Sequence, residues 1–198
     1  EAAPVSLVAL PTGFHFDSHG WEIDVPQQVT RGWSKRRKVV GLPGAETWHC
    51  TLSLEPVATE LDERQWRAFV VELQGQENHV HIPANCQQPP APSCTVRAGA
   101  TNGYNLPLGG LPASSLILSR GEYITVALPS GHFRLAMLMA DIVSNGAGQA
   151  TATFKPALNE APTVGAIVEL ANPFCPMSFT ESRNGWGVSD GLSSFSFA

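Results

Sequence analysis

A run of four basic residues, Lys35-Arg36-Arg37-Lys38, is the densest charge in this sequence and its first candidate for a binding function. Arg31 and Trp33 come just before it. Cationic groups of this kind bind phosphates or an acidic protein surface, although a solvated hairpin tip would carry the same charges. We therefore keep these residues as a candidate interface or lumen lining: Arg31, Trp33, Lys35, Arg36, Arg37 and Lys38.

Histidines at alternate positions, His79 and His81, would point to the same face of a strand, as two ligands of a metal site would. A third ligand would have to come from His15, His19 or His49, and no spacing demands it. We therefore predict no metal site and interpret the pair as ordinary strand residues.

Motifs for catalysis are missing from the sequence. It has no G-x-S-x-G elbow, no cysteine in a local catalytic signature and no Gly-rich phosphate loop between a strand and a helix. Carboxylates that could pair for glycoside cleavage are no denser than in other β-rich chains: Asp17, Glu22, Asp24 and Glu46. We expect no enzymatic activity and no cofactor.

Four cysteines, Cys50, Cys86, Cys94 and Cys175, occur without a CxxC pair, which argues against a structural zinc site. Cys86 and Cys94 bracket a Pro-rich loop and could close a small disulfide outside a reducing compartment. Free, partly buried thiols are the alternative, and the sequence leaves both open.

The composition favours many short strands and turns. Hydrophobic residues make up 43% and charged residues 15%, with 18 Gly and 16 Pro, so less charge is present than the roughly 25% of an average domain. Faces covered by neighbouring subunits would explain this. The net charge of −5 predicts no specific nucleic-acid binding. No stretch approaches the ~18 apolar residues of a membrane helix, so we expect no membrane insertion.

Hydrophobic periodicity predicts a mainly β chain with one helix. Residues 46–54 alternate with a period of two, whereas 62–74 repeats at i, i+3, i+4 and i+7, with Asp62 as the cap and Gly75 as the stop. Alternating Phe195 and Phe197 predict a C-terminus docked as a strand. Further strands are expected at 79–83, 116–128, 133–143, 150–155, 166–170 and 174–179, and a Pro-, Gly- and Asn-rich stretch at 84–111 suits a domain boundary.

Tryptophans beside turns are candidates for binding sugars or anchoring a partner, because exposed aromatic rings do both. Core packing is the ordinary alternative. The three residues in question are Trp21, Trp33 and Trp186.

The order of these segments resembles that of distal or minor tail proteins of tailed bacteriophages. The similarity covers most of residues 29–197, in turn and packing residues rather than catalytic ones. It is carried by the helix Trp66–Gly75 and by Gly121–Ile124, Arg134-Leu135, Ala140–Thr151, Phe154–Leu158, Ala161-Pro162 and Val168–Pro173.

The resemblance implies a structural virion component at the tail tip, assembled in the cytoplasm of the bacterial host. Such a protein forms a homo-oligomeric ring, expected to be a hexamer, between the tail tube protein and the hub or baseplate proteins, with a lumen through which DNA passes. The expected fold is a split-barrel, tail-tube-like domain with one packed helix plus a second small β domain. The first would hold residues 1–84 with 181–198 returning, and the second residues 85–180.

A carbohydrate-binding module is the rival interpretation. In it, the second domain would use Trp or Tyr104 to stack on glycans of the host surface.

Overall fold

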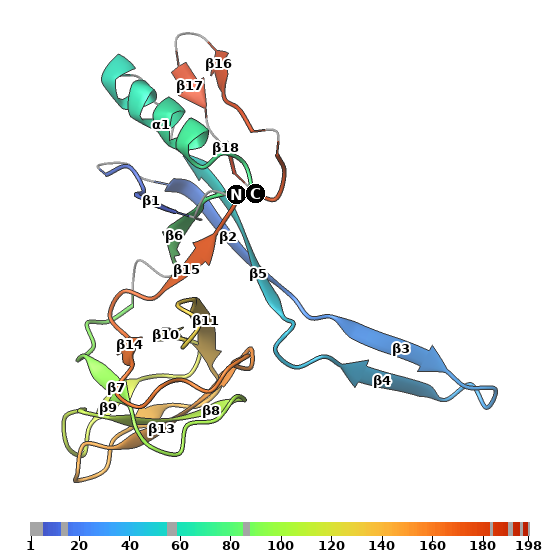
Figure 1. The fold of residues 1–198 in the computed structure, drawn as a ribbon, viewed down its shortest axis with the longest axis vertical. Coiled ribbons are helices and arrows are strands. Elements are labelled where there is room, and N and C mark those ends of the chain that lie inside the picture. Colours follow the sequence, from blue (N-terminus) through green and yellow to red (C-terminus); the bar gives the residue numbers. More distant parts are fainter. Residues whose placement is uncertain are drawn as a thin grey trace. The chain divides into compact units, whose positions relative to one another are not determined.

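The structure is a computed structural model that describes residues 6–12, 16–54, 59–84, 88–182, 184–189, 192–194 and 196–197. The prediction of a mainly β chain with one helix is confirmed. The chain divides into two units (Figure 1). The first contains residues 1–23, 48–82 and 176–198, and the second contains 24–47 and 83–175. Residues 24–47, which the sequence interpretation placed in the first domain, thus group with the second.

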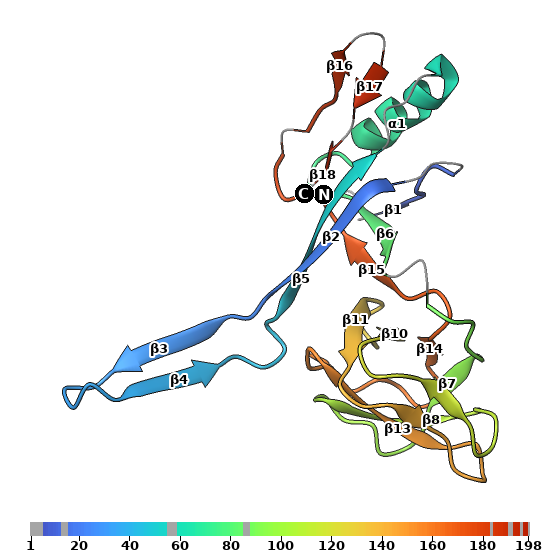
Figure 2. The ribbon, with the colours of Figure 1, turned by 180° about the vertical axis from the view of Figure 1, so that it is seen from behind.

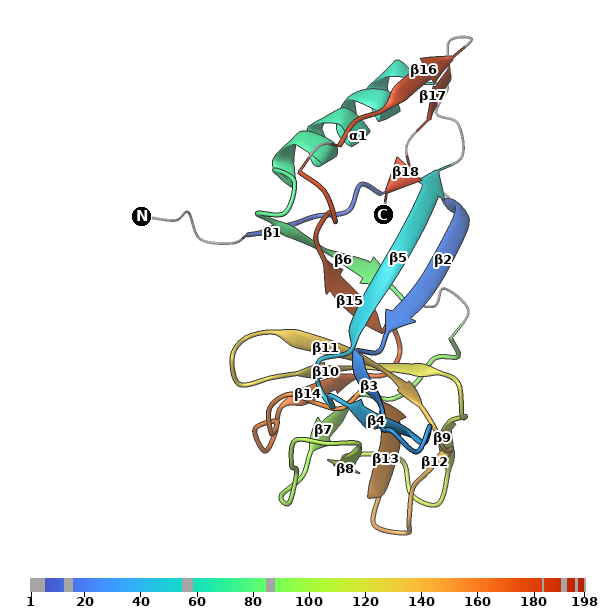
Figure 3. The same ribbon diagram turned by 90° about the vertical axis from the view of Figure 1, so that its right-hand side faces the viewer.

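The first unit contains two three-stranded sheets and the helix. One sheet has the order β1 (Leu7–Val8), β6 (His79–Pro83), β15 (Phe174–Met177), and the other has the order β18 (Ser196–Phe197), β5 (Thr47–Leu54), β2 (Phe16–Asp24). Figure 3 shows β2 and β5 running side by side.

The strand expected at 46–54 is confirmed, with Cys50, Leu52 and Leu54 buried on one face. The docked C-terminus is also confirmed, because Ser196 and Phe197 pair with Ser53 and Leu52. A hairpin of β16 (Gly187–Ser189) and β17 (Leu192–Ser194) completes this unit.

Helix α1 (Glu60–Glu72) forms because its apolar positions repeat along one face. Trp66, Phe69 and Val70 are buried on that face, and the Trp66 and Phe69 rings meet edge to face with centroids 5.4 Å apart. The helix starts two residues earlier than predicted, after Thr59 rather than at an Asp62 cap. It ends before Gly75, whose φ of 68° reverses the chain.

The second unit contains a closed six-stranded barrel, drawn in green to orange in Figures 1 and 2. Its strands, in spatial order, are β10 (Tyr123–Ala127), β11 (Phe133–Leu138), β13 (Ala150–Lys155), β8 (Asn105–Gly109), β7 (Cys94–Val96) and β14 (Ile167–Glu169). The sequence interpretation expected a barrel within residues 1–84, whereas the closed barrel lies within 94–169. Closure depends on pairing between strands distant in the sequence, such as β10 with β14, and local patterns do not encode it.

Alternating side chains fill the barrel. Leu106, Ile124, Val126, Phe154 and Val168 are fully buried, as expected for the inward positions of a small barrel. The single strand predicted at 116–128 is instead two, β9 (Leu116–Leu118) and β10, because a turn at Gly121 with φ 94° separates them. The strand predicted at 133–143 is likewise divided into β11 and β12 (Ile142–Val143), and β12 pairs with β9.

Gln88 joins two parts of the barrel wall through its side-chain amide. Its Nε2 donates to the carbonyl oxygens of Tyr123, at 2.8 Å, and Leu170, at 2.5 Å. Its Oε1 accepts the Tyr123 N–H at 2.9 Å. The side chain therefore satisfies backbone groups at the start of β10 and just beyond β14.

Candidate partner-binding arm

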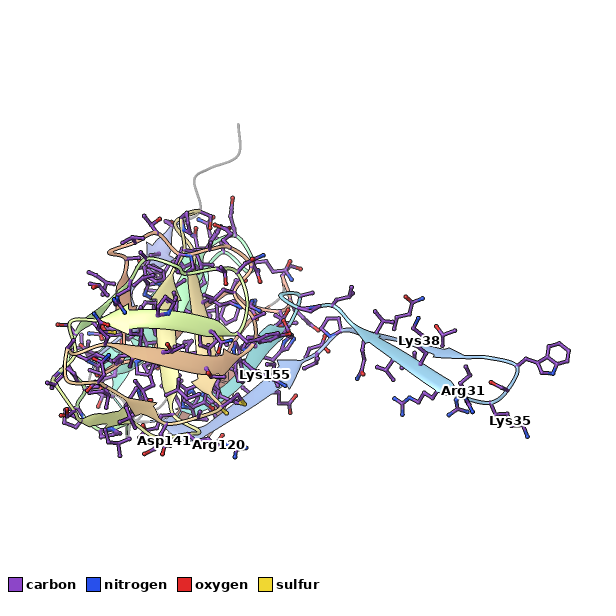
Figure 4. All side chains as sticks on the ribbon, turned by 90° about the horizontal axis from the view of Figure 1, so that it is seen from below. Arg31, Lys35, Lys38, Arg120, Asp141 and Lys155 are labelled. Carbon is purple, nitrogen blue, oxygen red and sulfur yellow. The ribbon has the colours of Figure 1, made fainter. Side chains whose placement is uncertain are left out.

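The basic run lies on a two-stranded hairpin inserted between β2 and β5. Strand β3 (Gln27–Arg31) pairs antiparallel with β4 (Arg37–Gly41), in a register that places Gln27 opposite Gly41 and Arg31 opposite Arg37. We call residues 25–45 the arm. Figure 4 shows its side chains standing off both faces of the ribbon, with Arg31, Lys35 and Lys38 labelled.

Every residue from Gln27 to Pro43 is exposed to solvent, on both faces of the hairpin. Most hairpins bury one face against a core, and an isolated pair of strands is only marginally stable in water. The arm nevertheless carries several exposed apolar side chains, and Trp33 at its tip is fully exposed at 104%. The other exposed apolar residues of the arm are Val25, Val29, Val39, Val40 and Leu42.

The register of the hairpin determines which of these side chains share a face. Because directly opposed residues of an antiparallel pair share a face, Val29 and Val39 lie together on one face of the hairpin. Arg31 and Arg37 form the next opposed pair on that face toward the tip, because the intervening pair, Thr30 and Lys38, lies on the other face. Two like charges directly opposite each other destabilise a strand pair unless an anion separates them. This face therefore offers an apolar patch followed by a basic one.

The tip itself holds a strained backbone. Lys35 adopts a φ of 58°, its N–H donates to the Gly32 carbonyl at 2.9 Å, and the Gly32 N–H donates to the Arg36 carbonyl at 3.2 Å. This left-handed conformation costs a side-chain-bearing residue roughly 1–2 kcal/mol relative to glycine. The turn thus holds a lysine where glycine would be less strained.

A buried ion pair fixes the base of the arm within the second unit. Arg134 on β11 donates through its Nη2 to the carbonyl oxygens of Glu46, at 2.8 Å, and Gly44, at 3.5 Å. The same Nη2 lies 3.7 Å from the Glu46 carboxylate, which accepts the Gly44 N–H at 2.6 Å. Burial lowers the pKa of Arg134, and the neighbouring Glu46 and Cys175 oppose that shift. The sequence analysis named Glu46 only among the carboxylates that could pair for glycoside cleavage. It did not identify Arg134 as the partner of Glu46.

Cys94, one of the two cysteines of the candidate disulfide, is a free, buried thiol whose Sγ lies 3.8 Å from the Val168 carbonyl oxygen. Cys86 itself lies outside the described residues. Burial raises the pKa of Cys94 to about 12, with a further contribution from Glu169, and burial alone raises that of Cys50 to about 12.

We therefore expect Cys94 and Cys50 to resist alkylation in the native chain, because the reactive thiolate is not formed near neutral pH. After denaturation without a reductant, both should be labelled completely. Mass spectrometry of the digested protein measures this residue by residue. Labelling of Cys94 only after a reductant is added would instead establish a disulfide.

The paired histidines lie on β6 as predicted, with ring centroids 5.9 Å apart. Among the residues that the structure describes, no three His, Cys, Asp or Glu side chains form a group that could hold a metal ion. Burial lowers the pKa of His81, and the charge of His79 lowers it further. Burial also lowers the pKa of His19 on β2.

These shifts predict that acid destabilises the first unit. A lowered pKa means that the folded state binds the proton less readily than the unfolded state, so the stability is fully present above the ordinary pKa of about 6.5. This contribution to stability is lost as the pH falls toward the lowered pKa of the folded state. The melting temperature should thus drop by a few degrees between neutral pH and mild acid, and less so in His81→Gln. Exposed His49 supplies the control, since the same pH-dependent drop should persist in His49→Gln.

Of the candidate tryptophans, Trp33 alone stands fully in solvent. Trp21 is half-buried and packs edge-on against Trp48, with ring centroids 6.0 Å apart, as expected for a core residue. Trp186 is 40% exposed. Of these three tryptophans, Trp33 on the arm is therefore the most accessible to a partner.

No helix among the described residues is long and apolar enough to cross a membrane. Comparisons with protein-family models and with curated proteins find no match to this chain.

Proposed function

We propose that the chain is a structural component of a phage tail tip, a distal or minor tail protein. In this proposal six copies form a ring that joins the tail tube to the hub and receptor-binding apparatus, around a lumen for DNA. The observation that carries it is the arm, a hairpin with two open faces. A surface of exposed apolar and basic side chains suits a protein that is buried in an assembly.

Other features support the same proposal. The surface is poor in charge for a protein of this size, which suits extensive contacts between subunits. The sequence resemblance to tail-tip proteins supplies the virion context.

The experiment is the solution mass of the purified chain across a range of concentrations, followed by negative-stain imaging. Rings of defined size are expected. Imaging with purified tail tubes added covers the case of a ring that closes only on its template. A chain that stays monomeric and leaves the ends of the tubes bare would contradict the proposal.

A carbohydrate-binding module remains the second candidate, on one observation: Tyr104, just before β8, is 37% exposed on the barrel unit. Residues 85–180 contain no Trp, and among their exposed aromatic rings Tyr104 is the one that we assign to stacking. Retention of the full chain on a glycan affinity gel, lost in Tyr104→Ala and kept in Trp33→Ala, would favour this function over the first.

A further inference from the structure

We propose that the arm binds the acidic body of a second copy of this chain. The inference rests on the proposed function, since it names the partner that the arm would meet in a ring. Charge is segregated along the sequence, and both faces of the hairpin are exposed.

Charge is strongly divided between the arm and the rest of the chain. The arm has five basic residues and no acidic one. Of the chain's 12 basic and 17 acidic residues, seven basic and all 17 acidic ones thus remain outside it, a balance of −10. The rest of the chain therefore has a net charge opposite in sign to that of the arm, so a second copy supplies the charge that the arm needs.

Among the described residues, no carboxylate forms an ion pair with the arm's cations. Across the part of the chain that the structure describes, the ion pairs join Arg64 to Glu60, Arg67 to Glu63 and Arg134 to Glu46, and none reaches the arm. Carboxylates outside the arm are meanwhile available to a neighbour. Apart from Glu60, which pairs with Arg64, the exposed ones among the described residues are Glu22, Asp24, Glu72, Glu77, Asp141 and Glu181.

A contact between the arm of one copy and the body of the next joins two different surfaces. Such a heterologous contact repeats from copy to copy and closes into a ring when the rotation between copies permits. It would also cover Val29 and Val39 and place carboxylates beside the opposed Arg31 and Arg37. Both features that destabilise an isolated hairpin would then be relieved together.

A charge-reversed arm, Arg31→Glu/Arg37→Glu, provides the test, because both residues are exposed and opposed on one hairpin. The matched control is Arg120→Glu/Lys155→Glu, which makes the same change in net charge at exposed sites labelled in Figure 4. Sedimentation velocity at about 50 mM and about 500 mM salt compares them with the wild type, because salt at the higher concentration screens exposed charges strongly.

We expect wild-type self-association to weaken at high salt and to weaken at least about tenfold on arm reversal at low salt, with little change in the control. Arm-reversed protein should still bind immobilised wild type, because its body remains a target for the wild-type arm. Arm-reversed protein should not bind itself.

Three outcomes would overturn the inference. Wild type that stays monomeric at low salt would do so, as would arm-reversed protein that associates as well as wild type. If the arm-reversed protein still forms rings, the proposed ring function stands and only the arm's role in it fails. Binding of duplex DNA that is lost on arm reversal, without any effect on self-association, would assign the arm to nucleic acid instead.

Discussion

Gly148→Ala is expected to destabilise the barrel unit by about 3–5 kcal/mol, enough to unfold a marginal domain. Gly148 follows β12 and has a φ of 67°. A Cβ there would lie 2.2 Å from the Leu111 carbonyl oxygen, far inside van der Waals contact. The Leu111 N–H donates to the Gly148 carbonyl at 3.1 Å, so the two segments cannot separate without breaking that bond.

Gly131, in the turn between β10 and β11, supplies the matched control. Its φ of 86° also disfavours a side chain, but a Cβ there would meet nothing within 4 Å. Gly131→Ala should therefore cost only the conformational strain, roughly 1–2 kcal/mol. Urea unfolding followed by far-ultraviolet circular dichroism measures both variants. Equal losses in the two would show that the contact with Leu111 is not what requires glycine.

Local patterns were enough to predict some elements of the first unit, among them β5 and α1. The alternation of residues 46–54 and the helical repeat of 62–74 report which face of each segment is buried, whatever it packs against. The helix begins two residues earlier than predicted because Thr59, without a side-chain capping bond, precedes its first turn. It also ends two residues earlier, with Leu73 as the C-cap and a positive φ already at Gln74.

The barrel could not be predicted because it is assembled from long-range pairings. Pairs such as Thr125 with Glu169 join residues far apart in the sequence, and nothing local specifies them. The break between β9 and β10 was missed for another reason. Ser119, Arg120 and Glu122 around Gly121 are a local turn signal, which the interpretation of 116–128 as one continuous strand overlooked.

The candidate site was found by composition but not by its geometry. The basic run identified the arm, yet the exposure of both its faces depends on the absence of covering side chains, which no local pattern reports. The support at its base was also invisible, since Arg134 and Glu46 are 88 residues apart. Isolated charged residues in strands are common, and only burial marks this pair as structural.

Arg134→Met should lower the stability of the second unit by about 3–5 kcal/mol, the usual cost of leaving one partner of a buried ion pair behind. Methionine fills much of the same volume but donates no hydrogen bond. The Glu46 carboxylate, 10% exposed, would then keep its charge without a cation. The carbonyl oxygens of Gly44 and Glu46 would also lose their donor.

Neutralising Glu46, whose charge is left without a cation in Arg134→Met, should restore part of the lost stability. In Arg134→Met/Glu46→Gln the neutral amide can still accept the Gly44 N–H through its oxygen, so the double variant should be more stable than Arg134→Met alone. Urea unfolding of the wild type, both single variants and the double variant completes the cycle. A double variant that is as unstable as the sum of the two single ones would show that the pair is not coupled.

The same cycle connects stability to the proposed assembly. Because the ion pair holds the base of the arm, Arg134→Met should loosen the arm without changing any residue on its exposed faces. Hydrogen exchange should speed up at the Gly44 amide in Arg134→Met and slow again in the double variant. Self-association should weaken in the same order, since a loosened arm must be ordered again on binding. Unchanged exchange at Gly44 would separate the ion pair from the arm and leave it as an element of barrel stability alone.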